Sequence, residues 1–222
     1  MTLTLHYHPL ASFCHKALIA LYELELPFER VIVDFGDAAS AEAFRKISPM
    51  AKMPVLVDGS RVISESSLVI EYANRIGDGR LIPADFDAAL AVRFWDRFFD
   101  HYLQFPMQKI VIDNLRPQAD RDPFGVAQAK AEILQAYGHL ETALGSGWLP
   151  GPEFSMADCA AVPALFYATT VVPLGTEYPG VESYFGRLYS RPSVARTLRE
   201  AEPWFGNFPH PAKLALPVNA AS

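Results

Sequence analysis

Hydrophobic and polar positions alternate, and then recur at helical spacing, through the first part of the chain. Residues 3–7 alternate as a half-buried strand does, and residues 12–25 carry apolar side chains three and four positions apart, which predicts an amphipathic helix. A β-branched run at 28–33 predicts a second strand, and residues 40–47 have a helix-like pattern. The chain is therefore expected to begin as strand, helix, strand, helix.

A hairpin is the next predicted element. Two β-branched runs at 55–57 and 61–63 flank an Asp-Gly pair at 58–59, which is a strong signal for a tight turn. Proline has no amide hydrogen for a strand ladder, so Pro54 belongs at the first position of its strand or at an edge. We therefore expect Met53 to present an unpaired stretch of backbone.

A helix start follows the hairpin directly. Ser64 can cap a helix over residues 65–75, and the first turn of that helix has backbone amides without helical partners. Free amides and the positive end of a helix dipole attract a carboxylate. The exposed edge and this helix start together suit a short peptide-like ligand with a free carboxylate and a free amine, and Glu65 could bind the amine.

The pattern changes beyond the hairpin helix. Residues 79–84 predict a linker, and no strand signal comparable with the earlier ones follows them. From residue 85 onward apolar side chains recur at helical spacing, with further helical patterns at 122–144 and 155–170. An aromatic run at the same spacing is assigned to packing and comprises Phe94, Trp95, Phe98, Phe99 and Tyr102.

These elements predict two domains. The first is an α/β domain with the order βαβαββα over residues 1–78, in which helices cover a small sheet. The second is an all-α helical domain over residues 85–222. Within it, Ser155 and Asp158 have the spacing of a capping box that uses Asp in place of Glu or Gln, and we expect this pair to start a core helix rather than to do chemistry.

Composition narrows the class of protein. The chain has 222 residues, of which half are hydrophobic and a fifth are charged, and its formal net charge is -6. These values are typical of a soluble globular protein and give no sign of a surface for nucleic acid. We expect no membrane-spanning segment and no secretory signal at residues 1–8, and hence a cytoplasmic protein.

The cysteine count agrees with that compartment. Cys14 and Cys159 are the only cysteines, and neither lies at a metal-ligand spacing, so we expect two reduced thiols and no disulfide. The histidines near the amino end lack acidic or cysteine partners at metal spacing, so no metal site is expected. The proline-rich carboxyl end is expected to be irregular, with residues 219–222 frayed.

Several motifs together resemble the glutathione transferase family, over about the whole length of the chain. They are the segments 48–56 and 65–66, the linker, and the segments 154–158 and 187–192, in the order in which the family has them. The resemblance implies a thioredoxin-like first domain and a helical second domain.

The resemblance also implies how glutathione is held as co-substrate. Pro54 matches a proline that is cis in the family, and Met53 would pair its backbone with the cysteinyl part of glutathione. Glu65 and Ser66 would hold the γ-glutamyl end. Lys52 would lie near the glycyl carboxylate, although an isolated lysine is more often simply solvated.

The position that usually activates the thiol is occupied by alanine. Residues 9–16 follow the first strand, and in a thioredoxin-like frame the C-x-x-C positions correspond to Ala11 and Cys14. Ala11 has no thiol or hydroxyl, so dithiol oxidoreductase chemistry is not expected. Ser12 is the first candidate, because its hydroxyl at the helix start could donate a hydrogen bond to the thiolate of glutathione. Alternatively, Ser12 only caps the helix.

Two other residues near the helix start are alternatives. Cys14 lies in the first turn beside His15 and Lys16, so it could ionise and form a mixed disulfide with glutathione, or it could be a small buried hydrophobe. Tyr7 matches the activating phenol of tyrosine-type members of the family, but strand alternation gives it the wrong register.

The second substrate is expected in an apolar cleft between the domains. Its candidate wall residues, chosen by position, are Leu10, Phe105, Met107 and Phe166. The resemblance implies a homodimer in which the helix around Ser67 and Arg75 faces the helical domain of the other subunit.

Three functions follow from these residues. The leading one is a glutathione transferase that adds the thiolate of glutathione to small hydrophobic electrophiles, a detoxification reaction whose electrophile the sequence does not name. The second is a glutathione-dependent thiol transferase or peroxidase that works through Cys14. The third is a non-catalytic binding protein with the same fold, and Ala11 keeps that possibility open.

Overall fold

A four-stranded mixed sheet forms the centre of the first half of the molecule. The computed structural model describes residues 3–216. The strands are β1 (Leu3–Tyr7), β2 (Phe28–Ile32), β3 (Val55–Asp58) and β4 (Arg61–Ser64). Their order across the sheet is β2-β1-β3-β4, with β1 and β2 parallel and the other neighbouring pairs antiparallel. The hairpin therefore forms where the sequence predicts it.

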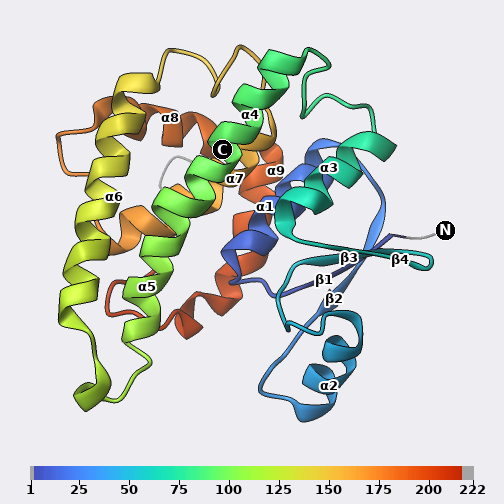
Figure 1. Cartoon of the computed structure of the whole chain (residues 1–222), viewed down its shortest axis with the longest axis horizontal. Coiled ribbons are helices and arrows are strands. Elements are labelled where there is room, and N and C mark those ends of the chain that lie inside the picture. The colour runs from blue at the N-terminus through green and yellow to red at the C-terminus, as the bar shows by residue number, and fades with distance from the viewer. Residues whose placement is uncertain (1–2, 217–222) are drawn as a thin grey trace.

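Three helices cover the two faces of this sheet (Figure 1). They are α1 (Ser12–Glu23), α2 (Ala38–Ile47) and α3 (Ser66–Ile76). Leu5 and Leu56 face α1 and α3 within the main core, whereas Val55 packs with Phe44 of α2 in a small separate cluster. Because strand side chains alternate between faces, neighbouring residues of β3 serve the two different clusters.

The remainder of the described chain is helical. Its α-helices are α4 (Phe86–Phe98), α5 (Phe105–Asp113), α6 (Pro123–Ala143), α7 (Met156–Val171), α8 (Pro179–Tyr189) and α9 (Pro192–Ala201). A π-helix, η1 (Phe99–Gln104), joins α4 to α5, and two short 3-10 helices are η2 (Gln118–Asp120) and η3 (Glu202–Asn207). The predicted order, a thioredoxin-like α/β part followed by helices, is confirmed. The end of the tail, residues 217–222, lies outside the described residues.

One helix boundary differs from the prediction. Ser64 was expected to cap a helix that starts at Glu65, but Ser64 pairs with Val55 in the hairpin ladder and belongs to β4. Glu65 instead occupies the N-cap position of α3 with a φ of 71°, and the helix begins at Ser66. Ser64 is therefore held in the strand pair with Val55 and does not cap the helix.

Helix α7 forms the centre of the helical part, and its start has the predicted capping box. The Ser155 hydroxyl accepts a hydrogen bond from the Ala157 amide at 3.2 Å, and the Asp158 carboxylate accepts one from the Ser155 amide at 2.8 Å. Asp158 also accepts from the Tyr184 hydroxyl at 2.6 Å and from the Leu149 amide at 3.2 Å. This helix start is completely enclosed, and its role is structural.

A buried ionic cluster joins the two halves of the chain. The Lys16 ammonium lies 2.6 Å from the Asp96 carboxylate and 2.8 Å from that of Asp100, and it donates to the Ser67 hydroxyl at 2.8 Å. Ser67 in turn donates to Asp96 at 2.7 Å. The cluster links α1, α3, α4 and η1. Ser67 therefore faces the helices of its own chain, and Lys16 is neutralised by carboxylates rather than directed at Cys14.

Candidate functional site at the start of α1 and α3

The loop before β3 has an open backbone edge. The Ser48 hydroxyl donates to the Lys52 carbonyl at 3.1 Å and accepts from the Lys52 amide at 3.3 Å, which closes the loop. The Met53-Pro54 peptide bond is cis, as the resemblance implies. The ladder begins only at Val55, and the Met53 backbone makes no hydrogen bond to any residue from 3 to 216. Lys52 is exposed beside this edge.

The start of α3 also has unused donors. The first helical hydrogen bond runs from the Val69 amide to the Glu65 carbonyl at 2.9 Å, so the amides before Val69 have no helical acceptor. Glu65 makes no capping bond, and the hydroxyl of Ser66 is without a partner in the described part of the chain. A positive φ at a glutamate costs about 1–3 kcal/mol, and residues in strained backbone conformations cluster at functional sites. This helix start can receive a carboxylate.

Strand register brings these two features to one end of the sheet. Val55 pairs with Ser64, so Pro54 and Glu65 continue side by side beyond the hairpin ladder. His6 pairs with the same Val55 from the other side, so the chain after β1 leaves the sheet at this end too. The start of α1 therefore lies at the same edge as the open Met53 backbone and the start of α3.

The start of α1 has a hydroxyl that is not used for capping. Ala11 is the N-cap residue and has no side-chain acceptor, and Ser12 is the first residue of the helix. Ser12 is 6 % exposed, and its hydroxyl makes no hydrogen bond within residues 3–216. The capping alternative for Ser12 therefore does not describe this helix start. Its hydroxyl remains a donor for a ligand.

The turn before α1 is fixed from several sides. The Ala11 amide donates to the His8 carbonyl at 3.0 Å, and the Leu10 amide donates to His8 Nδ1 at 3.1 Å. The Tyr167 hydroxyl of α7 donates to the Leu10 carbonyl at 2.9 Å, and His15 Nε2 bonds to the carbonyl of Pro9. Ser12 therefore projects from a rigid turn.

Comparison with known proteins agrees with this geometry. Residues 11–76 match the family model for the glutathione S-transferase N-terminal domain, and residues 123–187 match the model for the C-terminal domain. The chain belongs to the glutathione S-transferase family. The first matched segment contains Ser12, Met53, Pro54, Glu65 and Ser66, which are the residues at the open edge and the two helix starts.

Relatives match over most of their length. Glutathione S-transferase hmp2 of Hypomyces subiculosus is 29% identical over 199 residues, which is 84% of this chain and 93% of hmp2. Glutathione S-transferase GstB of Escherichia coli K12 is 27% identical over 191 residues, which is 82% of this chain and 91% of GstB. Together with the two domain matches, these relatives identify the chain as a glutathione S-transferase enzyme.

Solved structures share the fold. A glutathione S-transferase from Methylobacillus flagellatus KT with glutathione bound has a TM-score of 0.82 at 21% identity, over 88% of this chain and 98% of that one. The transferase URE2P8 from Phanerochaete chrysosporium, with oxidized glutathione, has a TM-score of 0.82 at 23% identity, over 92% and 97%. At these identities the likeness establishes the fold alone.

Cys14 does not have the surroundings of a reactive thiol in this transferase. Its side chain is fully buried, and burial raises the pKa of Cys14 to about 12. Burial also lowers the pKa of His15 to about 4, so that imidazole is neutral, and Lys16 is paired with carboxylates. Within residues 3–216 no cation is therefore available to stabilise a thiolate at Cys14, and this part of the structure gives no support to a mechanism through it.

The predicted wall residues fall into two groups. Leu10 is half-buried at the turn, and Phe105 is 48% exposed with its ring 5.9 Å from that of Phe13. Met107 and Phe166 are buried, and Phe166 packs against Phe205 within the core. Only the first group has side chains that reach the surface.

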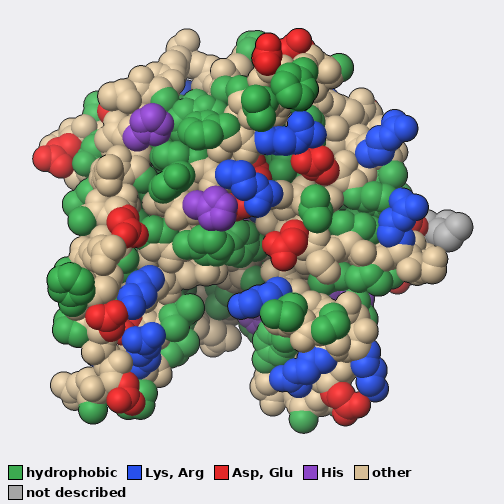
Figure 2. All heavy atoms as spheres, viewed as in Figure 1, with side chains coloured by type: hydrophobic (Ala, Val, Ile, Leu, Met, Phe, Trp, Pro, Cys, Tyr) green, Lys and Arg blue, Asp and Glu red, His purple; other side chains and the backbone are tan. Residues whose placement is uncertain are grey.

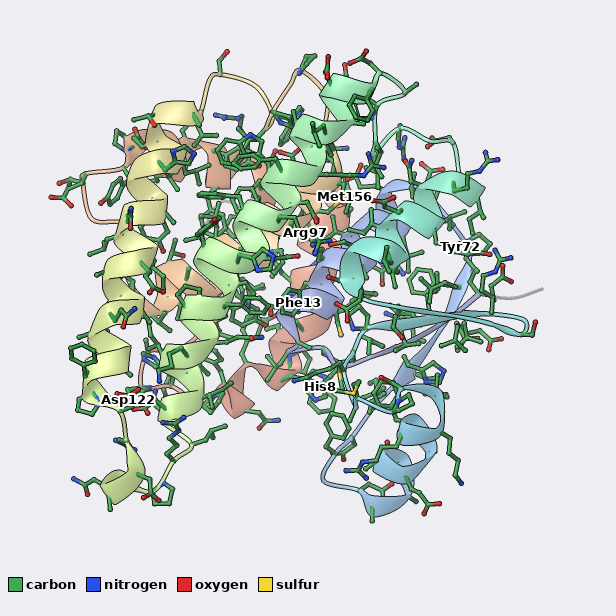
Figure 3. The ribbon with its side chains drawn as sticks, viewed as in Figure 1. His8, Phe13, Tyr72, Arg97, Asp122 and Met156 are labelled. Carbon is green, nitrogen blue, oxygen red and sulfur yellow. The ribbon has the colours of Figure 1, made fainter. Side chains whose placement is uncertain are left out.

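Two aromatic residues near the site were missed by the sequence reasoning. Phe13 projects from the first turn of α1, and Trp204 of η3 lies edge-on to His8 with ring centroids 5.0 Å apart. Figure 3 places His8 and Phe13 at the same end of α1. Figure 2 shows the surface hollowed below this end, between the lower ends of α5 and α6 and the lobe formed by α2. Helical spacing alone does not separate such wall residues from core aromatics.

No cluster of three or more His, Cys, Asp or Glu side chains that could hold a metal ion occurs among residues 3–216. No helix in that range is long and apolar enough to cross a membrane. Both cysteines are free and buried.

Proposed function

We propose that this glutathione S-transferase joins the sulfur of glutathione to small hydrophobic electrophiles, with the Ser12 hydroxyl stabilising the thiolate. The observation that carries the proposal is the unused hydroxyl of Ser12 at the start of α1. It lies at the same sheet edge as the open Met53 backbone and the uncapped start of α3.

Capture of glutathione uses the open edge and the α3 start. The Met53 backbone would pair with the cysteinyl residue, as one more short strand beside the sheet. The free amides of α3 and the Ser66 hydroxyl would receive the γ-glutamyl carboxylate, and the Glu65 carboxylate would bind the amine. Lys52, exposed beside Met53, would lie near the glycyl carboxylate. The unusual backbone of Glu65 supports a binding role for this segment.

Activation and transfer then need few further groups. The thiol of glutathione releases its proton to solvent, and Ser12 donates a hydrogen bond to the sulfur anion. A hydrogen bond to a charged group contributes about 1.5–3 kcal/mol, equivalent to about one to two pKa units. The sulfur attacks the electrophilic carbon and forms a carbon–sulfur bond. With an aryl halide, the halide leaves with the bonding electron pair.

The electrophile would occupy the hollow beside α1. Leu10, Phe13 and Phe105 present apolar surface there, and Trp204 lies on the side of His8. Pockets with apolar walls and a few placed polar groups are typical of small-molecule sites. Hydrophobic electrophiles therefore fit this end of the molecule.

Steady-state conjugation with a panel of aryl halides and isothiocyanates tests the proposal, alongside calorimetry of glutathione binding. Ser12→Ala should lower kcat/KM by about 10- to 100-fold and raise the thiol pKa of bound glutathione. Ser60→Ala, a change at an exposed hairpin serine, should alter neither. Glutathione binding without turnover across the panel would overturn the conjugation reaction. No heat of binding would leave the non-catalytic alternative.

We also propose that the enzyme is a cytoplasmic homodimer. The cytoplasm supplies reduced glutathione and suits two free cysteines. The face shown in Figure 2 exposes apolar side chains from α3, α4 and η1, and a hollow of about 610 Å³ lies between α4 and α6. The large exposed residues on these elements include Leu68, Leu90, Phe94 and Tyr102, each more than half exposed.

An interface of this kind supports two-fold pairing, in which each copy covers the same strip of the other. Phe94→Glu should therefore produce monomers in sedimentation velocity, whereas Phe124→Glu, at an exposed phenylalanine at the start of α6, should leave the dimer intact. A wild-type protein that sediments as a monomer at micromolar concentration would contradict the homodimer.

A further inference from the structure

Gln104 is a buried amide that the fold does not use. It is the last residue of η1 and is 2% exposed, yet neither its Nε2 nor its Oε1 has a hydrogen-bond partner among residues 3–216. A buried polar group left in this state costs about 1–3 kcal/mol. Such groups are rare in folded proteins and call for a reason.

The helix that ends at Gln104 is itself unusual. α4, η1 and α5 follow one another without a break, and the π-turn in the middle adds a residue to the helical repeat. Turns of this type are uncommon and are found frequently at functional sites. This one changes the direction in which the residues after Asp100 project.

Two contacts fix the level of Gln104 against α1. Lys16 binds Asp100 at 2.8 Å, and the rings of Phe13 and Phe105 meet at 5.9 Å. The earlier residue of α1 therefore contacts the later residue of the η1–α5 segment, so the two segments run antiparallel. Gln104 lies between the two contacts.

The same two contacts bring Ser12 to the level of Gln104. Ser12 precedes Lys16 by one helical turn on the same face of α1, and Gln104 follows Asp100 by about one turn on η1. Both residues are buried, whereas Phe13 and Phe105 are partly exposed. The two polar residues thus occupy the inner side of this contact and the two phenylalanines its outer side.

We propose that Gln104 is a positioning residue for Ser12. The Gln104 side chain, whose two amide atoms have no partner among residues 3–216, turns toward Ser12 so that its Nε2–H donates to Ser12 Oγ, and this leaves the Ser12 proton to point at the sulfur of glutathione. No hydrogen bond from residues 3–216 holds the amide, so it can rotate to present its nitrogen. The inference rests on the proposed function, because Gln104 acts only through Ser12.

Gln104→Met tests this, since methionine keeps the size of glutamine and removes the donor. The thiol pKa of bound glutathione is read from the ultraviolet absorbance of the thiolate against pH, together with kcat and KM for conjugation. We expect a bound-thiol pKa higher by about half to one unit, a three- to tenfold fall in kcat, and a KM for glutathione changed less than twofold. The melting temperature should stay level or rise, because an unsatisfied amide is removed.

Two matched variants separate positioning from structure. Gln108→Met, one turn further along the same helix at a partly exposed site, should change neither the thiol pKa nor kcat. In a Ser12→Ala background, Gln104→Met should have no further effect on the thiol pKa, because the hydroxyl that it positions is gone. Gln104→Leu serves as a second variant and should behave as Gln104→Met does.

The outcomes distinguish this inference from the function on which it rests. An unchanged thiol pKa in Gln104→Met and Gln104→Leu, or an equal shift in the presence and absence of Ser12, overturns the role of Gln104 while Ser12 keeps its own. An unchanged thiol pKa in Ser12→Ala overturns the proposed activation itself.

Discussion

Helices α3 and α7 begin in opposite ways. At α7 the side chains of Ser155 and Asp158 satisfy the first amides, and Asp158 also receives bonds from Leu149 and Tyr184. At α3 the N-cap residue Glu65 has no capping bond, and the amides before Val69 lack a helical acceptor. The two starts contain the same kinds of residue, a serine and a carboxylate. Only at α7 do these side chains form hydrogen bonds with the backbone amides of their own helix start.

Surroundings account for the difference. The α7 start is buried in the helical core, where water cannot serve unpaired amides, so the chain must supply every acceptor. The α3 start is next to exposed Glu65 at the sheet edge. Water can accept hydrogen bonds from its unpaired amides there until a ligand replaces the water. A helix start that is left incomplete beside an open strand edge is therefore a better indicator of a binding site than the residue types alone.

The largest expected effect is a loss of stability on removing Asp158 from the start of α7. Asp158→Ala would leave three buried donors without an acceptor, and we expect the free energy of unfolding to fall by about 4 kcal/mol in urea denaturation. Asp85→Ala, which removes the exposed cap of α4, should cost about 1 kcal/mol. Equal losses in the two variants would show that burial does not set the difference.

The start of α1 adds a dependence on pH. Burial lowers the pKa of His15 from 6.5 to about 4, so the folded state favours the neutral imidazole. This stability is present above pH 6.5 and is lost as the pH falls through about 4, by about 3 kcal/mol in total. In His15→Gln the urea midpoint should fall less than in the wild type as the pH is lowered from 6.5 to 4. His101→Gln, a change at an exposed residue, should leave the wild-type fall unaltered. A wild-type midpoint that is level from pH 7 to 4 would contradict the prediction.

Replacing the serine at each helix start separates a structural role from a binding role. Ser155→Ala should lower stability by about 1 kcal/mol and leave glutathione affinity unchanged, because it removes a cap. Ser66→Ala should weaken glutathione binding about tenfold, or about 1.4 kcal/mol, with stability unchanged. Calorimetry and thermal unfolding on both variants measure the two effects. A Ser66→Ala protein that melts early but binds normally would assign Ser66 to the fold.

The smallest expected effect concerns the backbone of Glu65. Glu65→Gly relieves a φ of 71°, and Glu25→Gly relieves a φ of 52° in the turn after α1. Each should gain about 0.5–1 kcal/mol of stability once the greater freedom of unfolded glycine is counted. Only Glu65→Gly should lower glutathione affinity. A loss of affinity in both variants would show a general loosening of the domain rather than a local role.

Local signals predicted the hairpin and the fold around the proposed capture site. The Asp-Gly turn with its flanking β-branched runs located the hairpin, and the hairpin placed Pro54 and Met53 at its open end. The same reasoning misplaced the start of α3 by one residue, because the ladder bond pattern of Ser64 depends on its partner Val55 rather than on the local sequence. The roles of Met53, Glu65 and Ser66 in binding remain predictions.

The activation side depends on contacts between distant segments. Ser12 was a candidate from its position, but its unused hydroxyl and the burial of Cys14 follow from packing of α1 against the helices. The buried cluster of Lys16 with Asp96 joins residues that are far apart in the sequence, and no periodicity indicates it. Polar residues at core positions of different helices can be paired only once the helices are placed.

The edge-on contact of Trp204 with His8 gives the enzyme an optical reporter. The other tryptophans, Trp95 and Trp148, pack among aromatic and cationic side chains of the helical part, against His139 and Arg191. A protein with both replaced by phenylalanine would emit from Trp204 beside His8 alone. Its fluorescence would report, in real time and without a label, whether the proposed electrophile binds beside the start of α1.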